Sequence, residues 1–99
     1  MSAVLGARGI AHSFVGHPSM SGLYFAEKPP RNYRDWKSSD YSFYNEMAQF
    51  LHEEGVLCEP DSREPWFICE AHDAACLTDT LRGFERAVDA TVAAGGRPA

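Results

Sequence analysis

The sequence predicts one small α+β domain, in which a mainly antiparallel sheet is backed by two helices. The chain has 99 residues, which is enough for one compact domain but not for two. Hydrophobic residues make up 44% and charged residues 23%, a balance typical of globular proteins. Short apolar runs alternate with two segments of helical periodicity, and no Gly-rich loop marks a parallel βαβ unit. We therefore expect residues 1–99 to form a single domain with the order β β α β β α.

The first part of the chain predicts two strands and a connection. Phe14–Val15 and Met20–Phe25 flank a break of Gly and Pro residues, and aromatic and β-branched residues favour strands around such a turn. Glu27–Lys37 is polar and contains two prolines, with no sustained helical or strand period. We expect it to be an ordered surface connection, with Tyr33 and Trp36 folding back as anchors.

A helix is predicted from about Tyr41 to Glu54. Ser38–Asp40 offers an N-cap, and apolar residues recur behind it at the i, i+3, i+4 and i+7 positions. Gly55 suits the position after the helix, and Val56–Cys58 follows as a short buried strand. The apolar stripe of this helix consists of Phe43, Tyr44, Met47, Phe50 and Leu51. This stripe and the apolar residues of the first segment, Val4–Ile10, are more than one small sheet can cover, so we expect an exposed apolar face.

The end of the chain predicts a second short strand and the most regular helix. Trp66–Cys69 is apolar and follows a charged loop with two prolines. Apolar residues recur with helical spacing and predict a final helix, and Asp73 stands just before it as a candidate N-cap. These residues are Leu77, Leu81, Phe84 and Val88. Gly and Pro residues end this helix, and we expect a frayed tail at 95–99.

The charge balance and the lack of long apolar segments exclude several partners. Nine basic residues stand against fourteen acidic ones, and the net charge of −5 argues against nucleic acid. No run approaches the ~20 apolar residues of a membrane helix, and no secretion signal opens the chain, so we expect no membrane partner and a cytoplasmic protein. The three cysteines fit a reducing compartment, and we expect free thiols that are buried as small apolar side chains.

Two polar clusters are candidates for chemistry, and each has a simpler interpretation. Cys69, His72 and Cys76 are residue types that bind zinc, but their spacing is not that of a regular zinc site, so we expect no metal. His72 beside Asp73 resembles an acid–base pair, although local hydrogen bonding at a helix start is the favoured interpretation.

The loop before the second predicted strand contains the most suggestive polar pair, Arg63 and Glu64. Neighbours in an extended segment point to opposite faces, so only one of the two can easily enter a given cleft. Two solvated loop charges are the alternative. The generic catalytic motifs, such as the Gly-rich dinucleotide and phosphate loops, are absent, so we assign no catalytic residue.

The segment Leu51–Asp73 resembles the C-terminal small domain of class III pyridoxal-phosphate-dependent aminotransferases, and most closely the glutamate-1-semialdehyde aminomutase-like branch. The family pattern there is a helix ending in L-x-x-x-G-V, a short strand, a proline, a loop glutamate, a strand with Trp or Phe, Ala-His and an amphipathic helix. Each step is present in this order. Upstream, Gly16–Phe25 is similar to the family's G-x-M-F-x-x-F-F strand region, and Ser39–Asp40 to an S-D before its helix. The resemblance covers about Gly9–Val92.

The resemblance implies the C-terminal domain of a fold-type I enzyme, a dimeric parent, and amino-group transfer on a small amino or keto acid with pyridoxal phosphate. Glu64 matches the family's loop glutamate at the active site, so of the two candidate substrate-binding residues, Glu64 and Arg63, we expect Glu64 to be favoured. The flanks Arg63 and Pro65 depart from the usual aromatic and small residues, which favours a member other than an aminomutase. The cofactor lysine belongs to a large domain that is absent here, and Lys28 and Lys37 lie in a polar connection. We expect this chain alone to bind no cofactor and to be inactive.

Three hypotheses of function follow. The leading one is a C-terminal fragment of such an aminotransferase or aminomutase, which contributes substrate-pocket and interface residues. Its partners are then the missing large domain or a homodimer partner. The second is a stand-alone, non-catalytic binding or interaction module of the same layout, and the third is a zinc-binding domain.

Overall fold

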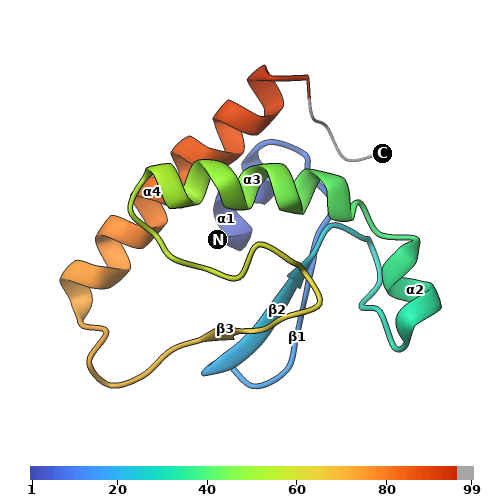
Figure 1. The fold of residues 1–99 in the computed structure, drawn as a ribbon, viewed down its shortest axis with the longest axis horizontal. Coiled ribbons are helices and arrows are strands. Elements are labelled where there is room, and N and C mark those ends of the chain that lie inside the picture. Colours follow the sequence, from blue (N-terminus) through green and yellow to red (C-terminus); the bar gives the residue numbers. More distant parts are fainter. Residues whose placement is uncertain (96–99) are drawn as a thin grey trace.

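A computed structural model of the chain describes residues 1–95 and is shown in Figure 1. The described part contains four helices and one three-stranded antiparallel sheet, in the order α1 β1 β2 α2 α3 β3 α4. The α+β class is confirmed, with two helices more and one strand fewer than the sequence predicts. The predicted frayed tail, apart from Gly95, lies outside the described residues.

The sheet has the order β1-β2-β3, and all its strands pair antiparallel. The predicted first two strands are confirmed as β1 (Ser13–Val15) and β2 (Met20–Tyr24), and β3 (Trp66–Phe67) adds a short edge. The turn between β1 and β2 requires Gly16, whose φ is +101°. A Cβ at this position would lie 2.8 Å from the carbonyl oxygen of Met20, so any other residue would strain the turn.

Both long helices are confirmed with the predicted caps. In α3 (Tyr41–Glu53), the Asp40 carboxylate accepts a hydrogen bond from a backbone N–H of the first turn at 3.0 Å. In α4 (Ala74–Ala93), Asp73 does the same at 2.9 Å. Gly55 follows α3 with a φ of +84°, as expected of a residue that ends a helix in the left-handed region.

The core lies where α3 and α4 pack against each other and against the sheet (Figure 1). The prediction that the apolar stripe of α3 is partly exposed is wrong, because the stripe is buried and only Phe50 remains half-buried. Helices from both ends of the chain supply the cover that one small sheet cannot. The buried apolar residues are Leu5, Ile10, Leu23, Phe25, Phe43, Tyr44, Met47, Ala48, Leu51, Phe84, Ala87 and Val88.

The first residues of the chain form a helix that the sequence analysis does not predict. Helix α1 (Ser2–Ala7) places Leu5 in the core, and Ile10 follows it there. The expectation that Val4–Ile10 lacks a packing partner is therefore wrong. Two isolated apolar residues give no visible period, yet both become buried once α4 lies beside them.

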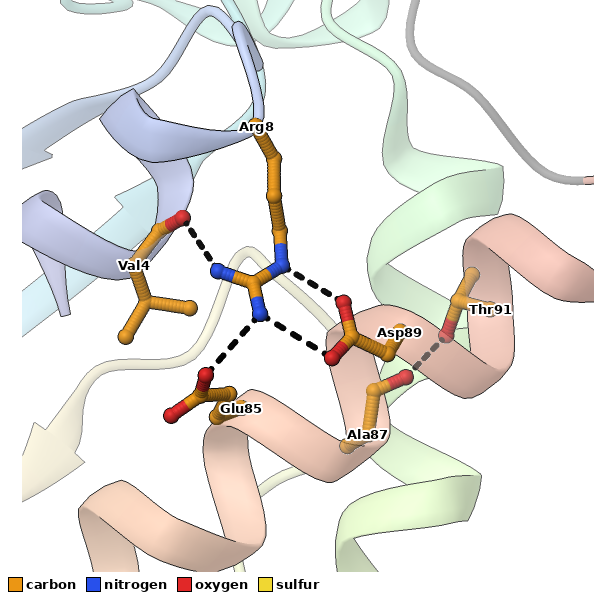
Figure 2. A network of polar contacts seen from close by, with 6 residues as sticks. All are labelled: Val4, Arg8, Glu85, Ala87, Asp89 and Thr91. Atoms are coloured by element: carbon orange, nitrogen blue, oxygen red, sulfur yellow. Dashed lines mark hydrogen bonds and ion pairs between the residues drawn. The ribbon is translucent and has the colours of Figure 1, made fainter.

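Arg8, at the end of α1, joins the two ends of the domain (Figure 2). Its guanidinium donates to both carboxylate oxygens of Asp89 and, at 3.0 Å, to Glu85, both on α4. Its third nitrogen donates to the carbonyl oxygen of Val4 at 2.9 Å. On α4, the buried Thr91 hydroxyl donates to the carbonyl oxygen of Ala87 at 2.8 Å, so it needs no other partner. The Arg8 fork thus ties α1 to α4.

The connection Glu27–Lys37 was expected to contain no helix or strand. It instead ends in the short helix α2 (Tyr33–Lys37). The Asn32 side chain caps it by accepting a hydrogen bond from the backbone N–H of Asp35 at 3.0 Å. Trp36 is an anchor, as predicted. Tyr33 lies against the Trp36 ring, with 5.4 Å between ring centroids, but its side chain stays 58% exposed.

The predicted buried strand at Val56–Cys58 is wrong. Leu57 is 90% exposed, and the structure assigns no strand to these residues. The backbone instead passes close to α3, where the carbonyl oxygen of Cys58 lies 2.6 Å from a ring nitrogen of His52. The segment is therefore held by a side chain of the preceding helix rather than by a sheet.

The last predicted strand is shorter than expected, and neither its end nor the start of α4 is buried. The strand ends at Phe67, and Phe67 and Ile68 are 66% and 55% exposed. Leu77 is 60% exposed, because the first turns of α4 extend beyond the rest of the core. All three cysteines are free thiols, as predicted, but two of them, Cys69 and Cys76, are exposed rather than buried.

Candidate functional site

The loop Pro60–Trp66, which we call the site loop, contains both candidate substrate-binding residues. Its anchor is Ser62, whose side chain is only 2% exposed and accepts a hydrogen bond from the indole nitrogen of Trp36 at 2.8 Å. The backbone N–H of Glu64 donates to the carbonyl oxygen of Asp61 at 3.0 Å, which closes a tight turn at the tip. The tip therefore has a defined backbone, although its charged side chains are exposed.

Arg63 is held by partners within the domain. Its Nε lies 3.1 and 3.0 Å from the two carboxylate oxygens of Asp61, and Nη2 also bonds that carboxylate. Its guanidinium carbon lies 5.1 Å from the ring centroid of Trp36, a cation–π distance. Hydrogen bonding to Arg63 lowers the pKa of Asp61, so the pair stays charged over the whole neutral range.

Glu64 differs from its neighbour. Its side chain is exposed, and within residues 1–95 its carboxylate has no hydrogen bond or ion pair. The two adjacent charges therefore have different environments: Arg63 is bound to Asp61 and Trp36, whereas Glu64 is available to a ligand.

The C-terminal end of the site loop is fixed to α3. The indole nitrogen of Trp66 donates to the hydroxyl of Tyr44 at 2.6 Å, and that hydroxyl donates to the carbonyl oxygen of Glu59 at 3.0 Å. Burial raises the pKa of Tyr44, so this phenol remains protonated and able to donate. The loop is thus attached to α3 at its ends and to α2 at its middle.

Two open depressions lie near these elements, but neither includes Glu64. The larger, of about 560 Å³, lies between the end of β2 and the start of α3. The other, of about 260 Å³, lies between α2 and Arg63 and is lined by Tyr24, Pro30, Arg31, Asn32, Tyr33, Trp36 and Arg63. Glu64 therefore lines neither of these two depressions.

The cluster near the start of α4 has a structural explanation. Asp73 caps the helix, and a ring nitrogen of His72 accepts a hydrogen bond from the backbone N–H of Cys69 at 3.1 Å. This is the local hydrogen bonding favoured from the sequence over an acid–base pair. Within residues 1–95 no three metal-binding side chains come together, and Cys69 and Cys76 remain exposed.

Sequence reasoning missed the residues that support the site. Trp36 was expected to be an anchor, since a tryptophan in a polar connection needs a packing partner, but its partner was unknown. Ser62 gives no signal, because its role depends on a side chain 26 positions earlier in the sequence. Asp61 would have been found as the acid two residues before Arg63, a spacing that suits a local ion pair.

The chain is similar to curated enzymes of one kind. It is 33% identical over 86 residues to the glutamate-1-semialdehyde 2,1-aminomutase of Bacillus subtilis, which covers 87% of this chain and 20% of that protein. It is 29% identical over 89 residues to the enzyme of the same name from Hydrogenobaculum sp., which covers 90% of this chain and 21% of that protein. A third relative, glutamate-1-semialdehyde 2,1-aminomutase 2 of Bacillus velezensis, is 30% identical over 90 residues, and the match covers 91% of this chain and 21% of that protein.

These similarities extend over almost the whole chain but only part of each relative. The chain spans about a fifth of the length of the curated relatives that it matches. No family model matches the chain. No helix within residues 1–95 is both long and apolar enough to cross a bilayer. The resemblance found in the sequence is confirmed: over nearly its whole length, this chain is homologous to a part of the glutamate-1-semialdehyde 2,1-aminomutases.

Proposed function

We propose that this chain is the C-terminal small domain of a cytoplasmic pyridoxal-phosphate-dependent aminomutase or aminotransferase, and that the site loop borders the substrate pocket of that enzyme. The observation that carries this proposal is the difference between the two charges at the loop tip. Arg63 is bound to Asp61 and Trp36, whereas the Glu64 carboxylate is exposed and unpaired within the described residues. Glu64 is therefore the residue that meets the substrate.

A carboxylate at this position suits an amino substrate. The amino or keto acids on which this family acts carry an ammonium group in one of their forms, and a carboxylate binds an ammonium group through charge-assisted hydrogen bonds. The turn at the loop tip and the Ser62 anchor restrict the backbone that carries Glu64. A restricted carboxylate orients a substrate at a lower entropic cost than a mobile one.

The cofactor of the parent enzyme would be held by residues outside this chain. Pyridoxal phosphate is bound covalently through a lysine, which needs an apolar pocket to lower its pKa. Lys28 and Lys37 are both exposed, so neither has the environment of such a lysine. We infer that the large domain supplies the cofactor site and the electronics of the reaction, and that this chain supplies substrate contacts.

The same parent would cover the exposed apolar residues at one end of the sheet, which we call the apolar sheet end. It consists of Met20, Phe67 and Ile68, each at least half exposed. Met20 pairs with Phe67 in the sheet, and the backbone N–H of Ile68 bonds to the residue before Met20, so the three are close together. Large apolar side chains that are grouped and exposed favour a protein partner. We assign this surface to the large domain or to a homodimer partner.

The proposal is tested in the enzyme that contains this domain joined to its large domain. Glu64→Gln removes the charge with little change in shape, and we expect kcat/KM to fall by roughly tenfold to a hundredfold, about 1–3 kcal/mol of transition-state stabilisation. Glu70→Gln is the matched control, since Glu70 is also exposed but lies beyond β3, and it should change kcat/KM less than twofold. If the two variants have equal kcat/KM, Glu64 does not bind substrate.

A further inference from the structure

Helix α2 contacts the site loop through the side chain of Trp36. The indole N–H of Trp36 donates to the Ser62 hydroxyl at 2.8 Å, and Ser62 is almost fully buried. The same indole ring lies 5.1 Å from the guanidinium carbon of Arg63. One ring therefore contacts two successive residues of the loop, one by a hydrogen bond at its edge and one over its face.

Trp36 is itself held firmly. Its ring stacks on Tyr41 at the start of α3, with 4.8 Å between centroids and 24° between planes. The carbonyl oxygen of Trp36 accepts hydrogen bonds from both the backbone N–H and the hydroxyl of Ser39, a buried residue. The indole therefore has contacts with α3 and with Ser39 that do not depend on the site loop.

The consequence reaches Glu64 through the backbone. With Ser62 bonded to the indole and Arg63 lying over it, the two residues before Glu64 cannot rotate freely. The bond from the Glu64 N–H to the carbonyl oxygen of Asp61 then fixes the turn. Arg63 also has its guanidinium bound to the Asp61 carboxylate.

We propose that Trp36 is a positioning residue of the substrate site, which fixes the site loop through Ser62 and Arg63 so that Glu64, and not Arg63, is presented to the substrate. This inference rests on the proposed function for its meaning in catalysis, but the positioning itself is a property of this chain. Trp36 would touch neither substrate nor cofactor.

Two substitutions separate the two contacts of the indole. Trp36→Phe keeps a ring under Arg63 but removes the donor to Ser62, whereas Trp36→Leu removes both. In the 99-residue chain, we expect the backbone order parameters of Arg63 and Glu64 to fall from about 0.85 to below about 0.6 in Trp36→Leu, with a smaller loss in Trp36→Phe. The order parameters of Phe84 and Val88 in α4 should not change, and they report whether the variant is folded.

A double substitution checks that the hydrogen bond is the cause. Ser62→Ala alone should lower the order parameters as Trp36→Phe does, and the two changes combined should add nothing further, since they remove the same bond. Unchanged order parameters at Arg63 and Glu64 in Trp36→Leu, with α4 intact, would overturn the inference. So would fully additive effects of Ser62→Ala and Trp36→Phe.

The failure of this inference is distinguishable from failure of the proposed function. Glu64→Gln should leave the order parameters of the loop unchanged, because its side chain has no partner within residues 1–95, while it lowers kcat/KM in the joined enzyme. If Trp36→Leu loosens the loop but Glu64→Gln leaves activity intact, the positioning is correct and the substrate role is wrong. In the joined enzyme, Trp36→Leu should lower kcat/KM and Trp36→Phe should restore part of it, a rescue that general destabilisation would not produce.

Discussion

The sharpest test of the fold compares two leucines that lie six residues apart and have opposite environments. Leu51, on α3, is fully buried against α4, whereas Leu57, just after the helix, is 90% exposed. Substitution of each by Ala makes the same chemical change. The sequence predicts that Leu57 is buried in a short strand and that Leu51 belongs to a partly exposed apolar stripe, so the comparison tests the structure where it corrects the sequence.

The expected magnitudes follow from burial. Leu51→Ala removes the isobutyl carbons beyond Cβ, and at about 0.8 kcal/mol for each buried carbon their transfer to water accounts for about 2.4 kcal/mol. A residual cavity in a core that cannot fully collapse raises the cost toward the range of about 2.7–5 kcal/mol. Leu57→Ala should change the free energy of unfolding by less than about 0.5 kcal/mol. Since small domains are stable by only about 5–15 kcal/mol, the first variant loses a large share of its stability.

Urea denaturation, followed by tryptophan fluorescence and by circular dichroism, measures both free energies. The two signals should coincide, and the slope with urea should be the same for the wild type and both variants, so that the midpoints alone report stability. A Leu57→Ala variant that is destabilised as much as Leu51→Ala would refute the exposed conformation of Val56–Cys58. A Leu51→Ala variant within about 0.5 kcal/mol of the wild type would refute the packing of α3 on α4.

Three further predictions concern the ends of the domain, its lysines and its apolar sheet end. Hydrogen bonding to Arg8 lowers the pKa of Asp89, so this pair stabilises the fold above about pH 4 and the contribution is lost as the pH falls through the lowered pKa. Arg8→Gln should therefore flatten the acid limb of the curve of unfolding free energy against pH, and an unchanged limb would contradict the role of the pair. Incubation with pyridoxal phosphate and borohydride should give no stoichiometric adduct at Lys28 or Lys37. An adduct located there by mass spectrometry would count against the proposal that the large domain supplies the cofactor site. The isolated chain should self-associate in sedimentation experiments, and Phe67→Ser should weaken this association, whereas a tight monomer at all concentrations would favour the stand-alone module.

Local signals account for what could be predicted from the sequence. Helices α3 and α4 are capped by Asp40 and Asp73, and Gly55 lies just beyond the end of α3; the side chains or backbone conformations of these residues act within one turn. The first hairpin is similar, because Gly16 fixes its turn irrespective of the rest of the chain. These elements were therefore predictable without knowledge of the fold.

The errors arise where burial depends on distant partners. Helix α4 has 20 residues and α3 has 13, so at ~1.5 Å per residue α4 is about 10 Å longer than the helix on which it packs. Leu77 continues the apolar period of α4 into that unpaired part, and periodicity alone cannot show where the partner ends. Helix α1 is the opposite case, because Leu5 and Ile10 have no local pattern and are buried only by segments far along the chain.

The candidate site, too, could be predicted only in part from the sequence. Glu64 could be singled out because the family resemblance gives its place in a motif. The features that distinguish it from Arg63, namely the ion pair with Asp61 and the indole of Trp36, come from the fold. An adjacent pair of opposite charges has no preferred member in the sequence alone.

The Arg8 fork has a consequence for how this domain is made. It joins residues 77 and 81 positions apart, so α1 emerges from the ribosome long before its partners on α4 have been synthesised. Closing so long a loop carries an entropic cost that must be met before the contact contributes anything. We expect the core of α3, α4 and the sheet to form first, with the docking of α1 as the last step. During synthesis Leu5 and Ile10 are therefore unprotected until α1 docks, and exposed apolar side chains of this kind favour aggregation.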